Sequence, residues 1–213
     1  MAVAAVSVGC QKVSEGGNQG VLRMEEGVDR YDNHEVRGGG THTASVAGAH
    51  AGTAERKPVD VDVKGTKISA YEGGLEQQMT GFLSAGSYDS AADDNALKDK
   101  WYNFDNVNFK MGSTNQLEPG SEAQLQNLAA ILKAYSEAKI KIGGYTDKTG
   151  QEPTNKTISQ GRADFIKSEL TRMGVGAQVI SAEGYGSQYA TVDASASDAE
   201  RAVDRKMAVR FTK

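Results

Sequence analysis

The stretch that decides the fold is AKIKIGGYTDKTGQEPTNKTISQGRADFIKSELTRMG, residues 138–174. Apolar residues alternate with lysines over residues 138–142, which predicts a half-buried β-strand that ends at a pair of glycines. A polar loop follows over residues 146–153. Beyond it, apolar side chains recur at the spacing of one helix face, and a glycine ends the pattern. The apolar helix positions are Ile158, Phe165, Ile166, Leu170 and Met173.

Further strand and helix patterns lie on both sides of this segment. Residues 101–109 are rich in aromatic side chains and predict a strand, and a helical stripe follows over residues 119–135. Two more strands are predicted at residues 179–185 and 207–212. With a short helix before the last strand, the order is β-α-β-α-β-β. This order predicts an α+β two-layer sandwich with two helices on one face of a mixed sheet.

Residues 11–58 differ in composition from the rest of the chain. They contain no Ile, Phe or Trp, one Leu and one Tyr, and many glycines. Such a segment buries too little apolar surface to offset the entropy of ordering its backbone. It is predicted to be a flexible, disordered, Gly-rich tether that spans on average about 40 Å.

Residues 59–98 form a third region. Valines alternate with aspartates over residues 59–63, and a second alternation after residue 66 predicts a β-hairpin, followed by a short apolar-faced helix over residues 75–83. A unit of this size is too small to stand alone. We expect it to pack on the main domain, residues 99–213, and to cover an edge strand of the sheet or to dock a partner protein.

The overall composition excludes several classes of function. The net charge of −4 and the pI near 5.5 argue against nucleic-acid binding, which needs a basic face. No apolar run of about 18 residues is present, so no transmembrane helix is predicted. One cysteine excludes an internal disulfide framework and a thiolate zinc site. His34, His42 and His50 fall in the Gly-rich segment without fixed geometry, so no histidine catalysis, metal site or cofactor is expected.

Charged and polar residues cluster around the loop that follows the central strand. Asp147 lies just past the strand, and Arg162 falls about two turns into the next helix. Asn155 and Ser159 lie near the start of that helix. A helix N-terminus and a guanidinium suit a carboxylate, whereas Asp147 suits an ammonium group, so the cluster fits a zwitterion such as the α-carbon end of an amino acid. Alternatively, Asp147 and Arg162 pair with each other, an interaction worth about 0–1 kcal/mol if exposed.

Several ordered motifs resemble the signature of the OmpA-like C-terminal domain, a family that also includes peptidoglycan-associated lipoproteins and flagellar motor stator proteins. The family pattern is roughly G-[HY]-T-D-x-x-G, an Asn after a short gap, then L-S-x-x-R-A. The matching segments are residues 144–150, Asn155, residues 158–163, residues 180–186 and residues 201–207, with Phe104 and Asp105 similar to an opening F-D strand. The resemblance covers about residues 101–213.

This resemblance implies non-covalent binding of peptidoglycan through the diaminopimelate of its stem peptide. Asp147 would face the ammonium end of that residue and Arg162 its carboxylate. Asn155, Asp105 and Thr146 stand at positions that line the same site in relatives. The flagellar motor members of the family carry a transmembrane helix, and none is predicted in this sequence, so a role as a motor stator is disfavoured.

The chain departs from the family pattern at five positions. Tyr145 replaces the commoner His, Ile158 replaces Leu, and Gly161 stands inside a helix, where it costs about 1 kcal/mol relative to Ala. Asp204 stands where Asn is frequent, and Lys206 where Arg is frequent, which changes the ion pairing expected near the site. None of the five departures falls on a residue that binds the ligand in the family.

Cys10 follows a short apolar run of small residues and looks like the end of a lipoprotein signal peptide, so residues 1–10 are predicted to be its remnant. No basic residue precedes the run, and Ser7 stands where Leu is usual. Acylation of Cys10 would anchor the chain to the periplasmic face of the outer membrane. The tether would then let the domain reach the cell wall. The alternative is an ordinary free cysteine.

Two functional hypotheses follow. The first is a non-catalytic cell-envelope protein that holds peptidoglycan from the outer membrane. The second is a cell-wall hydrolase that uses Asp105 and Asp147 as paired carboxylates, which glycosidases hold about 5–10 Å apart. The small size of the domain disfavours a substrate cleft for the second.

Overall fold

The computed structural model describes residues 56–213. The strands are β1 (Pro58–Val63), β2 (Thr66–Tyr71), β3 (Trp101–Asn103), β4 (Lys139–Gly144), β5 (Val179–Gly184) and β6 (Met207–Thr212). The α-helices are α2 (Leu75–Ser84), α3 (Ser121–Ala134), α4 (Glu152–Arg172) and α5 (Asp198–Arg201). Two short 3₁₀ turns, η1 (Asp94–Ala96) and η2 (Gly176–Gln178), complete the elements. Residues 11–55 of the predicted linker, Cys10 and the three histidines lie outside the described residues, and the predicted domain boundaries remain predictions.

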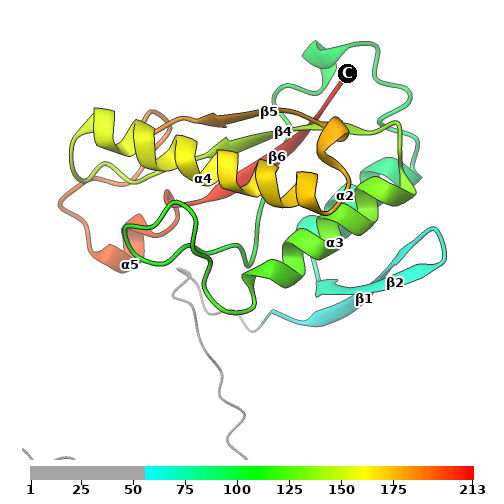
Figure 1. The fold of residues 1–213 in the computed structure, drawn as a ribbon, viewed down its shortest axis with the longest axis horizontal. Helices are drawn as coiled ribbons and strands as arrows, with labels where there is room; N and C mark the ends of the chain where they lie inside the picture. The colour runs from blue at the N-terminus through cyan, green and yellow to red at the C-terminus, as the bar shows by residue number, and fades with distance from the viewer. Residues whose placement is uncertain (1–55) are drawn as a thin grey trace, which may run out of the picture. The chain divides into compact units, whose positions relative to one another are not determined.

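Four strands form a mixed sheet in the order β3-β6-β4-β5. β6 runs antiparallel to both β3 and β4, whereas β4 and β5 are parallel and joined by α4. Helices α3 and α4 cover one face of this sheet (Figure 1). The α+β fold and the order β-α-β-α-β-short helix-β are therefore confirmed. No helix in residues 56–213 combines the length and the apolar composition needed to cross a membrane.

The first strand of the sheet is shorter than the aromatic pattern predicted. β3 ends at Asn103, because the next residues turn toward α3 instead of continuing the ladder. The backbone amides of Asn106 and Asn108 donate to the side chains of Gln124 and Ser121 at the start of α3. These side chains replace the partners that a longer strand would have provided.

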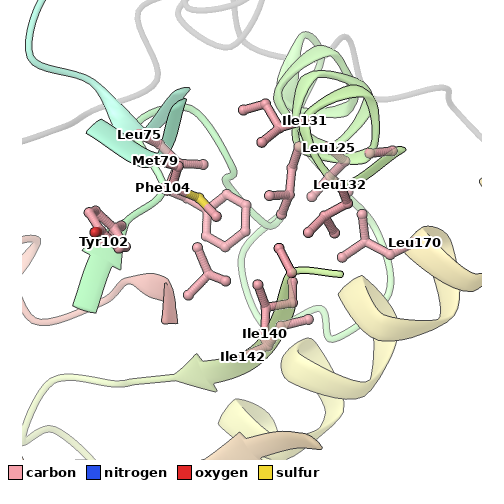
Figure 2. Packing of buried hydrophobic residues seen from close by; sticks show 14 of the residues in the cluster. Leu75, Met79, Tyr102, Phe104, Leu125, Ile131, Leu132, Ile140, Ile142 and Leu170 are labelled. Atoms are coloured by element: carbon pink, nitrogen blue, oxygen red, sulfur yellow. The ribbon is translucent and has the colours of Figure 1, made fainter. Parts of the chain in front are cut away.

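The main core lies between the sheet and its helices. Ile140 and Ile142 of β4 meet the α3 leucines and Leu170 of α4, as Figure 2 shows. Leu125, Leu132 and Leu170 are fully buried. Burial of each such side chain contributes about 1.5–3 kcal/mol, so this layer fixes where α4 lies.

The hairpin and α2 extend the helical side of the sheet. Phe82 of α2 stacks on Phe211 of β6 with ring centroids 5.3 Å apart, which makes α2 a third helix on that face. The β1–β2 hairpin turns at Lys64 and Gly65, both at positive φ as a two-residue hairpin turn requires. It packs on α2 and α3. Its apolar side chains join the core of the helices, and α2 also packs on β3, an edge strand of the sheet, where the rings of Phe82 and Tyr102 meet with centroids 6.4 Å apart. That the region docks a partner protein stays a prediction.

A buried ion pair lies on the opposite face of the sheet. All six residues of β6 are buried, so covered side chains occur on both faces of this strand. Arg210 donates two hydrogen bonds to the carboxylate of Asp94, at 2.7 and 3.0 Å, and Lys141 lies 3.5 Å from the same group. Thr212 also donates to Asp94. The segment between α2 and β3 is thus held across the sheet by charge.

We predict that Asp94→Ala destabilises the fold by about 1–2 kcal/mol, less than for a fully buried pair because Asp94 is partly exposed. Hydrogen bonds from Arg210 and then Thr212 hold the pKa of Asp94 well below its ordinary value. A depressed carboxylate pKa stabilises the fold above pH about 4, and that contribution is lost as the pH falls toward the folded-state pKa. Urea unfolding of Asp94→Ala and the parent at pH 7 and pH 3 checks this. The difference in unfolding free energy between Asp94→Ala and the parent should be smaller at pH 3 than at pH 7.

The control is Asp99→Ala, which removes the same charge from an exposed position in the same segment. If both variants unfold at the same urea concentration at pH 7, the ion pair does not stabilise the fold.

Candidate functional site

The end of β4 is held between two neighbouring loops. The backbone amide of Tyr145 donates to the carbonyl of Lys206 at 3.0 Å, and that of Thr146 donates to Gly186 at 2.9 Å. The loops after β5 and before β6 therefore extend the sheet pairing past the end of β4. This arrangement places the next residue, Asp147, at the end of the sheet, where α5 and the start of α4 also lie, at the left of Figure 1.

Two glycines let α4 approach this end of the sheet. A Cβ atom at Gly144 would overlap the carbonyl oxygen of Ser159, and one at Gly184 would overlap the backbone of Gln160. The Ser159 hydroxyl accepts a hydrogen bond from the amide of Gly186 at 2.9 Å. The second turn of α4 is therefore fixed against the ends of β4 and β5.

The carboxylate of Asp147 is buried and has four internal donors. One oxygen accepts from the amide of Thr149 at 3.0 Å and from its hydroxyl. The other accepts from Arg205 at 2.8 Å and, more weakly, from Arg201 at 3.4 Å. Burial raises the pKa of Asp147, but the hydrogen bonds from Thr149 and Arg205 outweigh it and lower the pKa below its ordinary value. Asp147 is thus an ionised acceptor.

Arg201 and Arg205 are the site residues that the sequence reasoning missed. Both also contact the exposed carboxylate of Asp198, which lies 3.0 Å from Arg205 and 3.4 Å from Arg201. They stand four residues apart in the segment 201–207, which had been matched to the family only as a late motif. Helix spacing gives no signal for the pair, because α5 ends at Arg201 and Arg205 lies beyond its last turn.

Asn155 and Thr146 lie beside Asp147 in different roles. The Asn155 amide donates to the carbonyls of Thr149 at 2.9 Å and Asp147 at 3.4 Å, so it fixes the loop that carries the carboxylate. The Thr146 hydroxyl is buried and has no hydrogen-bond partner among the described residues. A buried hydroxyl without a partner is costly, so Thr146 is a candidate to meet a ligand.

Arg162 has no carboxylate partner within 4 Å among residues 56–213. Its Nε donates to the carbonyl of Ser113 at 3.0 Å, and its guanidinium lies 5.1 Å from the centre of the Phe109 ring. Burial and then the charge of Arg205 lower the pKa of Arg162, although an arginine remains protonated at neutral pH. The alternative in which Asp147 and Arg162 simply neutralise each other is therefore not found.

Gly161 explains how residues 113–114, which contact Arg162 and the helix beside it, can lie so close to α4. A Cβ atom at this position would lie 2.9 Å from the Cβ of Thr114, which follows Ser113 in the same segment. A glycine is unfavourable inside a helix, but here it makes room for the segment that holds the Arg162 side chain. The departure from the family pattern thus has a packing reason.

Asp105 follows β3 in the chain, and its side chain lies at the N-terminus of α2. Its carboxylate accepts from the amide of Leu75 at 2.6 Å and weakly from the Gln124 amide, and Arg56 lies 3.4 Å away. These contacts cap a helix, and none joins Asp105 to Asp147 or Arg162 in the described part of the chain. The structure therefore brings Asp147, Asn155 and Thr146 together, links Arg162 to them through the charge of Arg205, and gives Asp105 different partners.

Asp204 and its neighbours order the loop before α5. The Asp204 carboxylate accepts from the amides of Thr191 and Val192 at 2.9–3.1 Å. Burial raises the pKa of Asp204, but these bonds outweigh it and lower the pKa. The aspartate is thus satisfied by backbone donors and not by an ion pair at the site, contrary to the expected change in ion pairing.

The arrangement suits recognition of an anion near a charged pair. Within residues 56–213, Arg162 presents a guanidinium with no acidic partner, and the charge of Arg205, which bonds Asp147, is near enough to lower the pKa of Arg162. No group of three His, Cys, Asp or Glu residues that could hold a metal occurs within residues 56–213.

The comparison with protein families agrees with this geometry. The model described as the OmpA family matches residues 108–205, a range that contains Asp147, Arg162 and Arg205. Residues 108–205 form an OmpA-family domain. The matched range begins after β3 and ends just before β6, two strands of the same sheet.

Curated relatives also match part of the chain. Outer membrane porin F of Pseudomonas fluorescens is 35% identical over 91 residues, 43% of this chain and 28% of the porin. Probable lipoprotein YiaD of Escherichia coli is 38% identical over 81 residues, 38% of this chain and 36% of YiaD. Peptidoglycan-binding protein ArfA of Mycobacterium bovis is 38% identical over 71 residues, 33% of this chain and 22% of ArfA. The match thus spans between about a fifth and about a third of these proteins.

A solved structure is also similar. The peptidoglycan-associated lipoprotein from Burkholderia pseudomallei is 29% identical, with a TM-score of 0.45. The similarity covers 50% of this chain and 88% of that structure.

We predict that Gly161→Ala changes stability in opposite directions in two backgrounds. In the parent, the new Cβ meets Thr114 at 2.9 Å and should destabilise the protein. In a Thr114→Gly background this contact is gone, and the better helix propensity of Ala should stabilise the protein by about 1 kcal/mol. Urea unfolding of the four variants of this cycle measures the coupling. Equal effects of Gly161→Ala in both backgrounds would contradict the close approach.

Proposed function

We propose that this chain is a non-catalytic peptidoglycan-binding protein of the cell envelope. The observation that carries the proposal is the Arg162 guanidinium, half-buried, without a carboxylate partner in the described part of the chain, and close to the Asp147–Arg205 pair. The OmpA-family match over these residues and the similarity to the peptidoglycan-binding protein ArfA support peptidoglycan as the ligand.

The bound group in this proposal is the diaminopimelate of the stem peptide. Arg162 would hold its carboxylate through a planar, two-point hydrogen bond that only a guanidinium makes. Asp147 would accept the ammonium group, and the partnerless Thr146 hydroxyl would bond to the same residue. Asn155 would act by holding the Asp147 loop in place. We assign Asp105 no direct contact, given its role at α2.

An ammonium group can reach Asp147 only if one internal donor gives way. The four donors already fill the acceptor positions of the carboxylate. Arg205 can do so at low cost, because it also bonds the exposed Asp198. The ligand ammonium would then replace the Arg205 charge at Asp147.

The hydrolase alternative is less well supported. A glycosidase needs one carboxylic acid whose pKa is raised so that it can donate a proton. The pKa of Asp147 is lowered, and Asp105 is engaged in capping α2. The named relatives are a porin, a probable lipoprotein and a peptidoglycan-binding protein. Binding without cleavage is the proposal that fits these observations.

We further propose that Cys10 is acylated and anchors the chain to the periplasmic face of the outer membrane. The small-residue run before Cys10 and the Gly-rich segment after it support this. The porin and lipoprotein relatives are consistent with an outer-membrane location. Two or more acyl chains give stable anchoring, whereas a single chain does not.

We predict that Asp147→Ala and Arg162→Ala each abolish co-sedimentation with peptidoglycan sacculi. Arg162→Lys should also weaken binding, because an ammonium lacks the two-point geometry. Free diaminopimelate should compete with sacculi for the parent protein. Pelleting assays with a fixed amount of sacculi measure all of these effects.

The matched controls lie on the same helix. Arg172→Ala removes a 72% exposed arginine, and Asp164→Ala removes an exposed carboxylate. Both should pellet like the parent. Parental pelleting of Asp147→Ala and Arg162→Ala would mean that the site is elsewhere, and release of soluble muropeptides by the parent would favour the hydrolase instead.

The anchoring proposal has its own test. Expressed with its native leader in a Gram-negative host, the chain should incorporate labelled palmitate and fractionate with outer membranes. Cys10→Ser should lose both properties while still binding sacculi. Palmitate incorporation equal to that of the parent would contradict acylation at Cys10.

A further inference from the structure

Four aromatic rings gather over Gly143, on the face of the sheet that carries Arg210 and next to the end of β4 that leads to Asp147. They are Trp101, Tyr145, Tyr185 and Tyr189, called here the aromatic platform. Tyr145 and Tyr185 are stacked with centroids 5.2 Å apart. Tyr189 meets both of them edge-on, at 6.0 and 5.5 Å, and Trp101 meets both at 6.4 and 6.2 Å. The rings come from three separate parts of the chain and form one cluster.

Packing accounts for part of this cluster only. Tyr145 is buried, and together with Trp101 it fills the space over Gly143 that a Cβ atom would otherwise enter. Arg210 lies 5.6 Å from the Trp101 ring. Tyr189 has no such role, because 57% of its surface is exposed. Packing on the other rings therefore does not account for the exposed part of Tyr189.

The loop that carries Tyr189 is well fixed. The amide of Ala190 donates to the carbonyl of Ser187 at 2.9 Å, and the amide of Thr191 donates to the buried Asp204. The Tyr189 ring is thus held in position before any ligand arrives. A fixed ring loses little conformational entropy on binding.

The platform shares its backbone with the candidate site. Tyr145 stands two residues before Asp147, and Tyr185 directly precedes Gly186, whose carbonyl accepts from the amide of Thr146. Lys206 and Lys156 border the rings, 5.7 Å or less from the centres of Tyr145 and Tyr185. The rim of the platform therefore offers hydrogen-bond donors and one exposed carboxylate, Glu183, to which the Tyr185 hydroxyl donates.

We propose that the aromatic platform binds an amino sugar of the peptidoglycan glycan strand while the Asp147 and Arg162 site holds the attached stem peptide. This inference rests on the proposed function. One face of a pyranose ring carries C–H groups that pack on an aromatic ring, and its hydroxyls bond to charged groups at the edge. The stem peptide is covalently attached to the sugar, and the two residues between diaminopimelate and the sugar reach only about 7 Å. A sugar would therefore lie near the site, and the platform, whose exposed ring is Tyr189, is joined to the site through the backbone of Tyr145, Thr146 and Gly186.

The test compares two ligands with the full chain. One is a disaccharide carrying the diaminopimelate stem peptide, and the other is the same peptide without sugars. The parent should bind the sugar-bearing ligand about three- to tenfold more tightly, the range expected for one aromatic contact. Trp101 is the only tryptophan of the chain, so binding of the sugar-bearing ligand should also change its fluorescence.

Three variants locate the effect. Tyr189→Ala should lose the advantage of the sugar-bearing ligand but keep the parental affinity for the free peptide, whereas Tyr189→Phe should keep both. Ile180→Ala, at another exposed apolar position, should behave like the parent. Equal affinity of the parent for the two ligands, or an unchanged advantage in Tyr189→Ala, would overturn the platform while leaving the stem-peptide site intact. Failure of the parent to bind either ligand would instead overturn the proposed function, and the platform with it.

Discussion

The close approach of α4 to the end of the sheet is the constraint on which the site depends. Gly144 and Gly184 bring the helix backbone against β4 and β5, where any Cβ atom would overlap Ser159 or Gln160. This contact sets the distance between the loop after β4 and the second turn of α4. Asp147 comes from that loop and Arg162 from that helix, so a larger residue at either glycine would separate the two groups that define the site.

Ion pairing among the charged side chains then determines which of their charges is left to bind a ligand. Asp147, Arg201, Arg205 and Asp198 form a network in which each carboxylate has at least one guanidinium. Arg162 feels the charge of Arg205 but has no acidic partner among residues 56–213, and it is held by neutral contacts with Ser113 and Phe109. A ligand carboxylate would therefore meet a positioned cation whose charge no acid of the described residues cancels. The same network makes Arg205 the donor that gives way most easily, because Asp198 remains as its second partner.

Most of the fold could be predicted because its signals are local. The alternation at residues 138–142 and the helical spacing at residues 158–173 gave β4 and α4 nearly to their ends. The first strand was predicted six residues too long, since its aromatic composition could not reveal that α3 side chains take its backbone donors. The position of the hairpin on α2 and α3 was also not predicted, because its apolar face fits either a sheet edge or a helix pair.

The amino-acid sequence by itself determined the order of the elements and the identity of Asp147, Arg162, Asn155 and Thr146 as neighbours of one loop and one helix. Only the tertiary structure decided which charges meet. Arg205 reaches Asp147 across 58 residues of chain, and Asp105, although predicted for the same site, caps α2. The physical reason is range: periodicity and helix signals act within a few residues, whereas an ion pair forms between groups that only the packed core brings together.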